Sequence, residues 1–153
     1  MSVNTQNISD LEEIDRFERA VETFNAGGID PDRFTAVRLQ QGVYGQRQHG
    51  VNMIRIKIPG GRLTAEQLVA VADITENYSQ RGIAHVTTRQ AIQIHFIPLA
   101  EMPDAMRRLA EVGMTSREAC GNAVRNMTAC GLSGVCPREH VDVAAHVDGA
   151  TRH

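Results

Sequence analysis

The sequence predicts an α+β fold in which helices pack against an antiparallel sheet. Residues 51–58 alternate apolar and polar side chains, as a half-buried strand does. A capped amphipathic segment over 64–82 indicates a helix, and two short β-like runs follow at 83–87 and 91–98. A further helical period spans 102–113. The order strand, helix, strand, strand, helix is typical of the split βαβ, or ferredoxin-like, arrangement.

Residues 1–50 are expected to form an N-terminal helix followed by an extended arm. Ser9 and Glu12 have the spacing of a capping box, and apolar residues then recur at helical spacing until the glycine pair at 27–28. Residues 29–50 hold a proline, several glycines and a polar run without a sustained period, which favours an extended arm with turns. The apolar residues of the helix are Ile14, Phe17, Val21 and Phe24.

Residues 51–114 are expected to hold the half-domain with the sheet and its two helices. A Pro-Gly-Gly turn ends the first strand, and Thr64 and Gln67 form a capping box for the helix that Gly82 closes. Each strand has one apolar side, which should face the helices. We assign to these apolar sides Ile54, Ile56, Ile58, Ala84, Val86, Ile92, Ile94 and Phe96.

Residues 115–153 show weaker patterns. Thr115 and Glu118 would cap a short helix, and residues 124–128 could add a last strand to the sheet. Residues 144–153 are polar and unpatterned, which is typical of a linker or a cut end.

Composition excludes several classes of function. The chain has 153 residues, with 16 basic and 18 acidic side chains, so no global charge favours nucleic acid or an acidic membrane. The N-terminus has neither a basic start nor an apolar run, which indicates a cytoplasmic protein. The three cysteines and six histidines fit no metal-binding spacing, so we expect no metal site made by this chain alone.

One face of the predicted sheet carries hydrogen-bond donors without balancing carboxylates. Such a face suits an anion-rich ligand, but wet polar faces are also common on antiparallel sheets, so pattern alone leaves both readings open. Arg125 and Asn126, further along the chain, could likewise have a local structural role or bind a ligand. The residues of the face are Arg55, Lys57, His85, Thr87, Gln93 and His95, with Arg89 in the connection between the last two strands.

Four motifs in fixed order make the chain resemble the nitrite and sulfite reductase haemoprotein family from about residue 29 onward. They are GVYGQRQ at 42–48, MIRIKIPGG at 53–61, HVTTRQAIQIH at 85–95 and VRNMTAC at 124–130. Members of this family bind sirohaem coupled to a 4Fe-4S cluster. The resemblance implies a six-electron reduction of sulfite to sulfide or of nitrite to ammonia.

The resemblance also implies roles for individual residues. Arg55 and Arg125 match the family's substrate-anion ligands, and their permanently charged forks suit an oxyanion. His85 stands where some relatives have arginine, so the charge of that contact would depend on pH. The expected sirohaem contacts are His85, Thr87, Arg89, Gln93 and Asn126.

The resemblance leaves parts of the site to be supplied from elsewhere. Cys120, Cys130 and Cys136 do not match the family's cluster ligands, so residues 115–153 are expected to be only the start of the sirohaem and 4Fe-4S domain. The missing C-terminal half, or a partner subunit, would complete the site, and ferredoxin or a flavoprotein would donate electrons. Two alternatives stay open: a non-catalytic module that binds a tetrapyrrole or assists assembly, and a fragment of a related cobalamin-pathway oxygenase.

Overall fold

The computed structural model describes residues 8–151, and its centre is a four-stranded antiparallel sheet. The strands β1 (Val43–Gly45), β2 (Val51–Ile56), β4 (Ile92–Pro98) and β3 (Ala84–Val86) lie side by side in the order β1-β2-β4-β3. The predicted α+β class, with an antiparallel sheet packed by helices, is confirmed.

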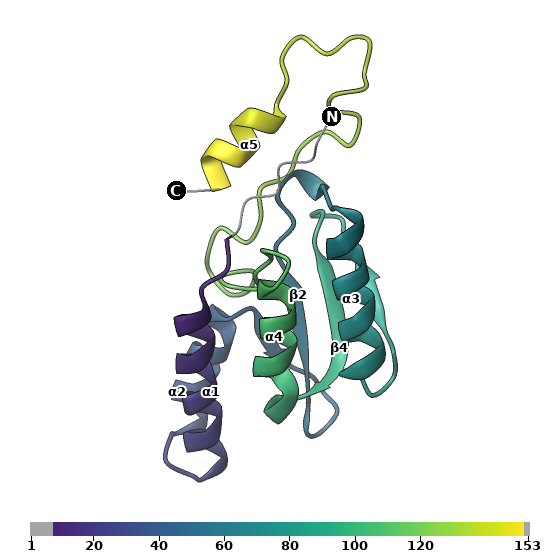
Figure 1. Cartoon of the computed structure of the whole chain (residues 1–153). Coiled ribbons are helices and arrows are strands. Elements are labelled where there is room, and N and C mark those ends of the chain that lie inside the picture. Colours follow the sequence, from purple (N-terminus) through teal and green to yellow (C-terminus); the bar gives the residue numbers. More distant parts are fainter. Residues whose placement is uncertain (1–7, 152–153) are drawn as a thin grey trace.

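Two helices cover the apolar face of this sheet. Helix α3 (Ala65–Asn77) follows the short helix η1 (Pro59–Gly61), and α4 (Met102–Ala110) follows η2 (Leu99–Glu101). Figure 1 shows α3 and α4 next to each other in front of β2 and β4. The predicted capping box of Thr64 and Gln67 begins α3. The core that joins these helices to the sheet includes Ile54, Ile56, Ile74, Ile92, Ile94, Met106 and Leu109.

Helix α1 (Leu11–Asn25) forms where the sequence predicts it, but its first residue differs. The side chain of Asp10 accepts a hydrogen bond from the Glu13 amide at 3.2 Å and caps the helix. The predicted capping box of Ser9 and Glu12 is therefore wrong, since Ser9 lies one residue before the cap and its hydroxyl donates to the Ala110 carbonyl at 3.5 Å. This contact joins the start of α1 to the end of α4.

The predicted extended arm over residues 29–50 is wrong, because most of it is α2 (Pro31–Gln40) followed by β1. Asp30 caps α2 by accepting from two backbone amides, and Pro31 occupies the first turn, where its missing N–H costs nothing. Only Phe34 of α2 is buried, stacked between Phe17 and Phe24 of α1. With one buried aromatic residue and the partly buried Val37 packed against the core, α2 has no sustained apolar period that would predict it.

The alternation of β4 is broken at Phe96. Its φ angle is +62°, and the pairing of β4 with β2 shifts between Asn52 and Ile54, as at a β-bulge. Ile97 is therefore fully buried while Phe96 is not, so the predicted inward position of Phe96 is wrong. Val86 pairs with Ile92 and so lies on the predicted side of the sheet, but on the edge strand β3 it is 83% exposed.

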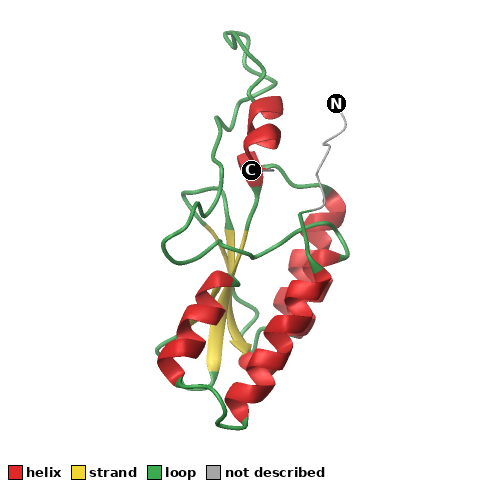
Figure 2. Ribbon diagram, turned by 90° about the vertical axis from the view of Figure 1, so that its left-hand side faces the viewer, coloured by secondary structure: helices red, strands yellow, loops and turns green. Residues whose placement is uncertain are grey.

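Residues 121–143 form neither the expected strand at 124–128 nor any other strand or helix, and turns and bends over 117–123 replace the expected short helix. The supposed linker at the end of the chain is wrong as well, since it contains α5 (Ala144–Thr151). Figures 1 and 2 show α5 beyond one end of the sheet, attached by a long loop. There α5 contacts η1, and Arg62 pairs with Asp148 at 2.5 Å. Among residues 8–151, no helix is both long and apolar enough to cross a bilayer.

Candidate anion site on the open face of the sheet

The register of the sheet places three of the predicted site residues in one row. Arg55 of β2 pairs directly with Gln93 of β4, and Gln93 pairs with His85 of β3. Because residues opposite one another in a sheet share a face, all three side chains lie on the face away from the buried Ile54 and Ile94. The predicted polar face is therefore a single row across the sheet at this level.

Arg55 is held by contacts from three directions. With the Gln93 amide oxygen turned toward the guanidinium, that oxygen accepts from Arg55 Nε at 3.0 Å and also from Nη2. Arg55 Nη1 donates to the Ala119 carbonyl at 3.2 Å, and the ring of Tyr44 lies 5.9 Å from the guanidinium carbon. These contacts fix the fork while leaving part of its five N–H groups for a ligand.

The turn between β3 and β4 brings Thr87 and Arg89 to the same place. The Thr87 amide donates to the Ala91 carbonyl at 2.8 Å, and the Thr87 hydroxyl accepts from the Ala91 amide at 3.2 Å. Arg89, inside this closed turn, has an exposed side chain. A short turn braced at both ends thus presents an arginine next to the row of Arg55 and Gln93.

Arg125 and Asn126 arrive on the loop that follows Gly121. Arg125 Nε donates to the Gly121 carbonyl at 3.0 Å, which folds the side chain back along its own loop. Asn126 Nδ2 donates to the carbonyls of Ile58, Arg89 and Gln90 at 3.0, 2.9 and 3.1 Å. Its Oδ1 is buried and accepts no hydrogen bond within the described part of the chain.

These segments enclose a cavity of about 220 Å³. Three arginines reach it from a strand, a turn and a loop, and none of the lining side chains described is acidic. Three guanidinium groups without a counter-ion favour an anionic ligand, because an anion offsets the repulsion between their positive charges. The lining residues are Arg55, Thr87, Thr88, Arg89, Ala91, Gln93, Arg125 and Asn126.

His85, the remaining predicted site residue, stands beside the cavity and pairs with His95. Their ring centroids are 4.8 Å apart with the planes tilted by 58°. Burial, and then the nearby His85, hold the pKa of His95 below its usual range. Gln46 accepts from the Phe96 amide at 2.6 Å, so its Nε2 faces His95 Nδ1 at 3.4 Å as a donor. The proton of neutral His95 therefore lies on Nε2, which is buried and has no partner among residues 8–151.

Lys57 has a contact that the pattern of the polar face did not indicate. Its ammonium lies 3.6 Å from the carboxylate of Glu118, which comes from the turns after α4. Lys57 is not part of the cavity lining. Its charge is thus balanced within the chain, whereas those of Arg55, Arg89 and Arg125 are not paired with any carboxylate in the described residues.

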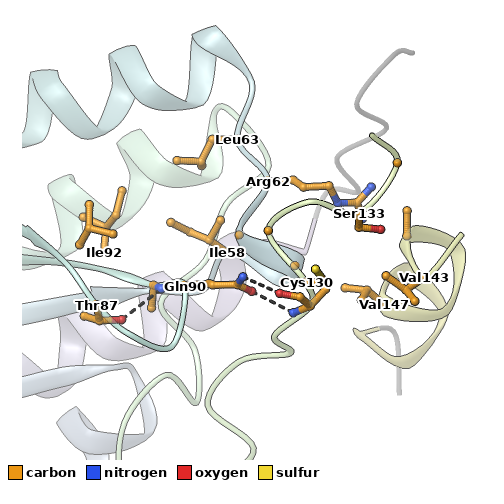
Figure 3. A pocket seen from close by; sticks show the side chains of 18 of the residues that line it. Ile58, Arg62, Leu63, Thr87, Gln90, Ile92, Cys130, Ser133, Val143 and Val147 are labelled. Atoms are coloured by element: carbon orange, nitrogen blue, oxygen red, sulfur yellow. Dashed lines mark hydrogen bonds between the residues drawn. The ribbon is translucent and has the colours of Figure 1, made fainter. Parts of the chain in front are cut away.

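A second, more apolar cavity of about 500 Å³ lies on the other side of the Thr87–Ala91 turn. Figure 3 shows Ile58, Ile92 and Val147 on its walls, with Gln90 reaching across to the loop at Cys130. Gln90 belongs to a motif of the sequence but was not among the predicted site residues. The sequence signal for Gln90 is its position next to Arg89 in the short connection between the two strands.

The three cysteines differ in their solvent exposure. Cys120 is buried, and burial raises the pKa of its thiol to about 11 although Arg55 and Arg125 oppose this shift. Cys130 is exposed, and Cys136 is half-buried. Within residues 8–151, no three side chains of histidine, cysteine, aspartate or glutamate come together as metal ligands.

Residues 44–112 match the family model described as the nitrite/sulfite reductase ferredoxin-like half domain. This part of the chain is similar to such a half domain. It includes the sheet, α3, α4 and all the site residues except Arg125 and Asn126.

Curated relatives extend the match beyond the half domain. The chain is 36% identical over 138 residues to the spinach chloroplastic ferredoxin–nitrite reductase, and this match covers 88% of the chain and 22% of the relative. It is 34% identical over 112 residues to an assimilatory ferredoxin-dependent nitrite reductase of Haloferax mediterranei, covering 66% of the chain and 19% of that protein. The chain thus spans about a fifth of the length of these relatives.

The fold around the half domain also matches a solved structure. The NirA protein of Mycobacterium tuberculosis superposes with a TM-score of 0.76 at 22% identity, over 95% of this chain and 32% of that one. Because the match covers 95% of the chain, it extends beyond residues 44–112.

Proposed function

We propose that this chain supplies the anion-binding part of a sirohaem-dependent nitrite or sulfite reductase. The observation that carries the proposal is the cavity where Arg55, Arg89 and Arg125 meet without a carboxylate among the described lining residues. Arg55 and Arg125 would bind the substrate oxyanion and, in its absence, a sirohaem carboxylate in the same cavity, because their charge persists at any working pH and their N–H groups match the oxygens of either anion. Binding through fixed donors would also stabilise negative charge that develops during reduction.

The donor set fits the carboxylates of sirohaem. Thr87, Arg89 and Gln93 add a hydroxyl, a guanidinium and an amide at the edge of the same cavity. A volume of about 220 Å³ suits one carboxylate arm or a small oxyanion, so the macrocycle itself would lie outside the cavity, over the open face of the sheet. When bound, sirohaem would supply the iron at which the oxyanion is reduced.

His85 and Asn126 would contribute in different ways. His85 lies on the same open face, where its ring N–H would donate toward a carboxylate. The Nδ2 group of Asn126 is occupied by three backbone carbonyls, so we propose that Asn126 acts on the site by holding its loop. This changes the role expected for Asn126 from direct contact to support.

Nitrite is the substrate we favour, with ferredoxin as the electron donor. The curated relatives from spinach and Haloferax are named as ferredoxin-dependent nitrite reductases, which supports both parts of this choice. It also supports a reductase over a cobalamin-pathway oxygenase. Sulfite stays the second candidate, because the half-domain description covers both oxyanions. We further propose that a 4Fe-4S cluster is bound by residues outside this chain and that the protein is cytoplasmic.

The proposal is tested by titrating the chain with sirohaem and following the absorbance of the tetrapyrrole. We expect saturable binding that Arg125→Ala weakens at least about tenfold, as loss of a charged hydrogen-bond donor does. Arg33→Ala is the matched control, because Arg33 is exposed on α2, away from the cavity. No change of the sirohaem spectrum with the wild-type chain, or equal binding by both variants, would contradict the proposal.

A further inference from the structure

Gln90 has a backbone conformation that its neighbours must hold in place. Its φ angle is +55°, in the left-handed region that residues other than glycine rarely adopt. This conformation costs on the order of 1 kcal/mol and persists where surrounding contacts determine it. The Gln90 amide donates to the Thr87 carbonyl at 3.1 Å, which closes the turn that carries Arg89.

The side chain of Gln90 pairs with both backbone groups of one distant residue. Its Nε2 donates to the Ala129 carbonyl at 2.7 Å, and its Oε1 accepts from the Ala129 amide at 2.9 Å. These two bonds fix the amide orientation and imitate the pairing of two strands. Figure 3 shows Gln90 reaching to this loop next to Cys130, with both bonds drawn. The turn of Thr87 to Gln90 is thus tied directly to the loop after Arg125.

The same loop is fastened at two further points. Asn126 donates to the carbonyls of Ile58, Arg89 and Gln90, and the Gly60 amide donates to the Met127 carbonyl at 2.8 Å. The loop has no helix or strand between residues 121 and 129, so it has no ladder of its own to define its path. These ties therefore decide where Arg125 lies relative to Arg55 and Arg89.

Gly61 leaves the space in which Gln90 makes this contact. A Cβ atom at Gly61 would lie 3.0 Å from Gln90 Cδ and 3.1 Å from its Cβ. Gly61 also has a φ angle of +69°, so both space and backbone favour glycine there. The glycine pair after β2 thus has a role in the site in addition to ending the strand.

We infer that Gln90 is a positioning residue for the anion site: it holds the loop of Arg125 against the turn of Arg89 so that both guanidinium groups reach one cavity. This inference rests on the proposed function, because it concerns how the same anion is bound. Gln90 itself lines the apolar cavity and not the one with the arginines, so it acts through Arg125.

The test combines Gln90→Asn with Arg125→Ala in a double-mutant cycle of sirohaem binding. Asparagine tolerates a positive φ but is one methylene shorter, so it loses the reach to Ala129 while keeping the turn. We expect Gln90→Asn to weaken binding about tenfold and the double variant to bind no more weakly than Arg125→Ala alone. The matched control is Gln48→Asn, an exposed glutamine in the turn between β1 and β2, which should leave affinity unchanged.

Hydrogen exchange gives a second readout that needs no ligand. In Gln90→Asn the amide of Ala129 should lose protection while the amides of β2 and β4 keep theirs, because only the loop is released. If Gln90→Asn does not fold, Gln90→Glu replaces it: the side chain has the same shape but cannot donate to the Ala129 carbonyl at neutral pH.

The outcomes separate the two claims. A wild-type chain that binds no sirohaem contradicts the proposed function. Wild-type binding together with additive effects of Gln90→Asn and Arg125→Ala, or with unchanged affinity in Gln90→Asn, contradicts the positioning role alone.

Discussion

Arg55 and Gln93 face each other across β2 and β4, and the amide oxygen of Gln93 accepts two hydrogen bonds from the Arg55 guanidinium. Two bonds to one oxygen orient the plane of the guanidinium. Since the pairing is set by strand register, the core that fixes the register through Ile54 and Ile94 also fixes the direction of this charge.

Arg55→Lys tests whether this orientation matters in addition to the charge. Lysine keeps the charge but has no planar fork, so we expect about tenfold weaker sirohaem binding. The free energy of unfolding in urea should change by less than about 1 kcal/mol, because Arg55 lies on the open face and not in the core. A loss of stability that parallels the loss of affinity would show that Arg55 supports the fold instead.

Phe34→Ala tests whether α2 belongs to the core. Phe34 is 3% exposed and stacks on Phe24 with ring centroids 4.1 Å apart, so its removal should cost about 3–5 kcal/mol in urea denaturation. Arg33→Ala, one residue earlier and exposed, should change stability by less than about 0.5 kcal/mol. Similar small effects for both variants would mean that α2 is only loosely attached.

Arg107→Met tests the link between α1 and α4. Arg107 bonds to Glu18 and, at 3.0 Å, to Asp15, and its hydrogen bond to Glu18 lowers the pKa of that carboxyl. The pair is partly exposed, so we expect a loss of only about 0.5–1 kcal/mol near pH 7.

The sign of the pH effect follows from Glu18. A carboxyl with a lowered folded pKa stabilises the protein above its unfolded pKa of about 4.3 and loses this contribution as pH falls through the folded pKa. The stability gap between wild type and Arg107→Met should therefore close below about pH 4, measured by urea denaturation at several pH values. A gap that stays constant down to pH 2.5 would exclude the ion pair as its cause.

His95→Gln tests the buried imidazole beside the site. The folded pKa of His95 is lowered, so below the unfolded value of about 6.5 the unfolded chain takes up a proton that the folded chain does not. Wild-type stability should fall between pH 7.5 and pH 5.5, and the fall should be smaller in His95→Gln. Thermal unfolding at both pH values, with His146→Gln at an exposed position of α5 as the control, measures this difference.

The sequence predicts best those parts of the fold whose residues share one buried face. Ile54, Ile56, Ile92 and Ile94 alternate because α3 and α4 cover only one side of the sheet. Helix α2 escaped prediction because its only buried side chain, Phe34, packs between two aromatic residues of α1 and leaves no period. The Asp30-Pro31 pair, a cap followed by proline in the first turn, was the signal available for it.

The site shows the same division. The residues on strands, such as Arg55 and Gln93, could be placed on one face from alternation alone. The meeting of Arg125 with them could not, because it depends on bonds such as Gln90 to Ala129, which join residues 39 positions apart through side chain and backbone. Such contacts leave no periodic signature, and only the resemblance of the motifs brought Arg125 into the expected site.

The bulge at Phe96 shifts the alternation of inward and outward side chains along β4 by one residue. Upstream of it Ile92 and Ile94 point inward and Gln93 faces the site, while downstream Ile97 is again inward although an unbroken strand would turn it outward. Because of this one extra residue, Gln93 can face the site while Ile97, on the same strand, faces the core. Substitutions after Phe96 should therefore leave the alternation that places Gln93 next to Arg55 unchanged. The two ends of β4 can then change in sequence independently.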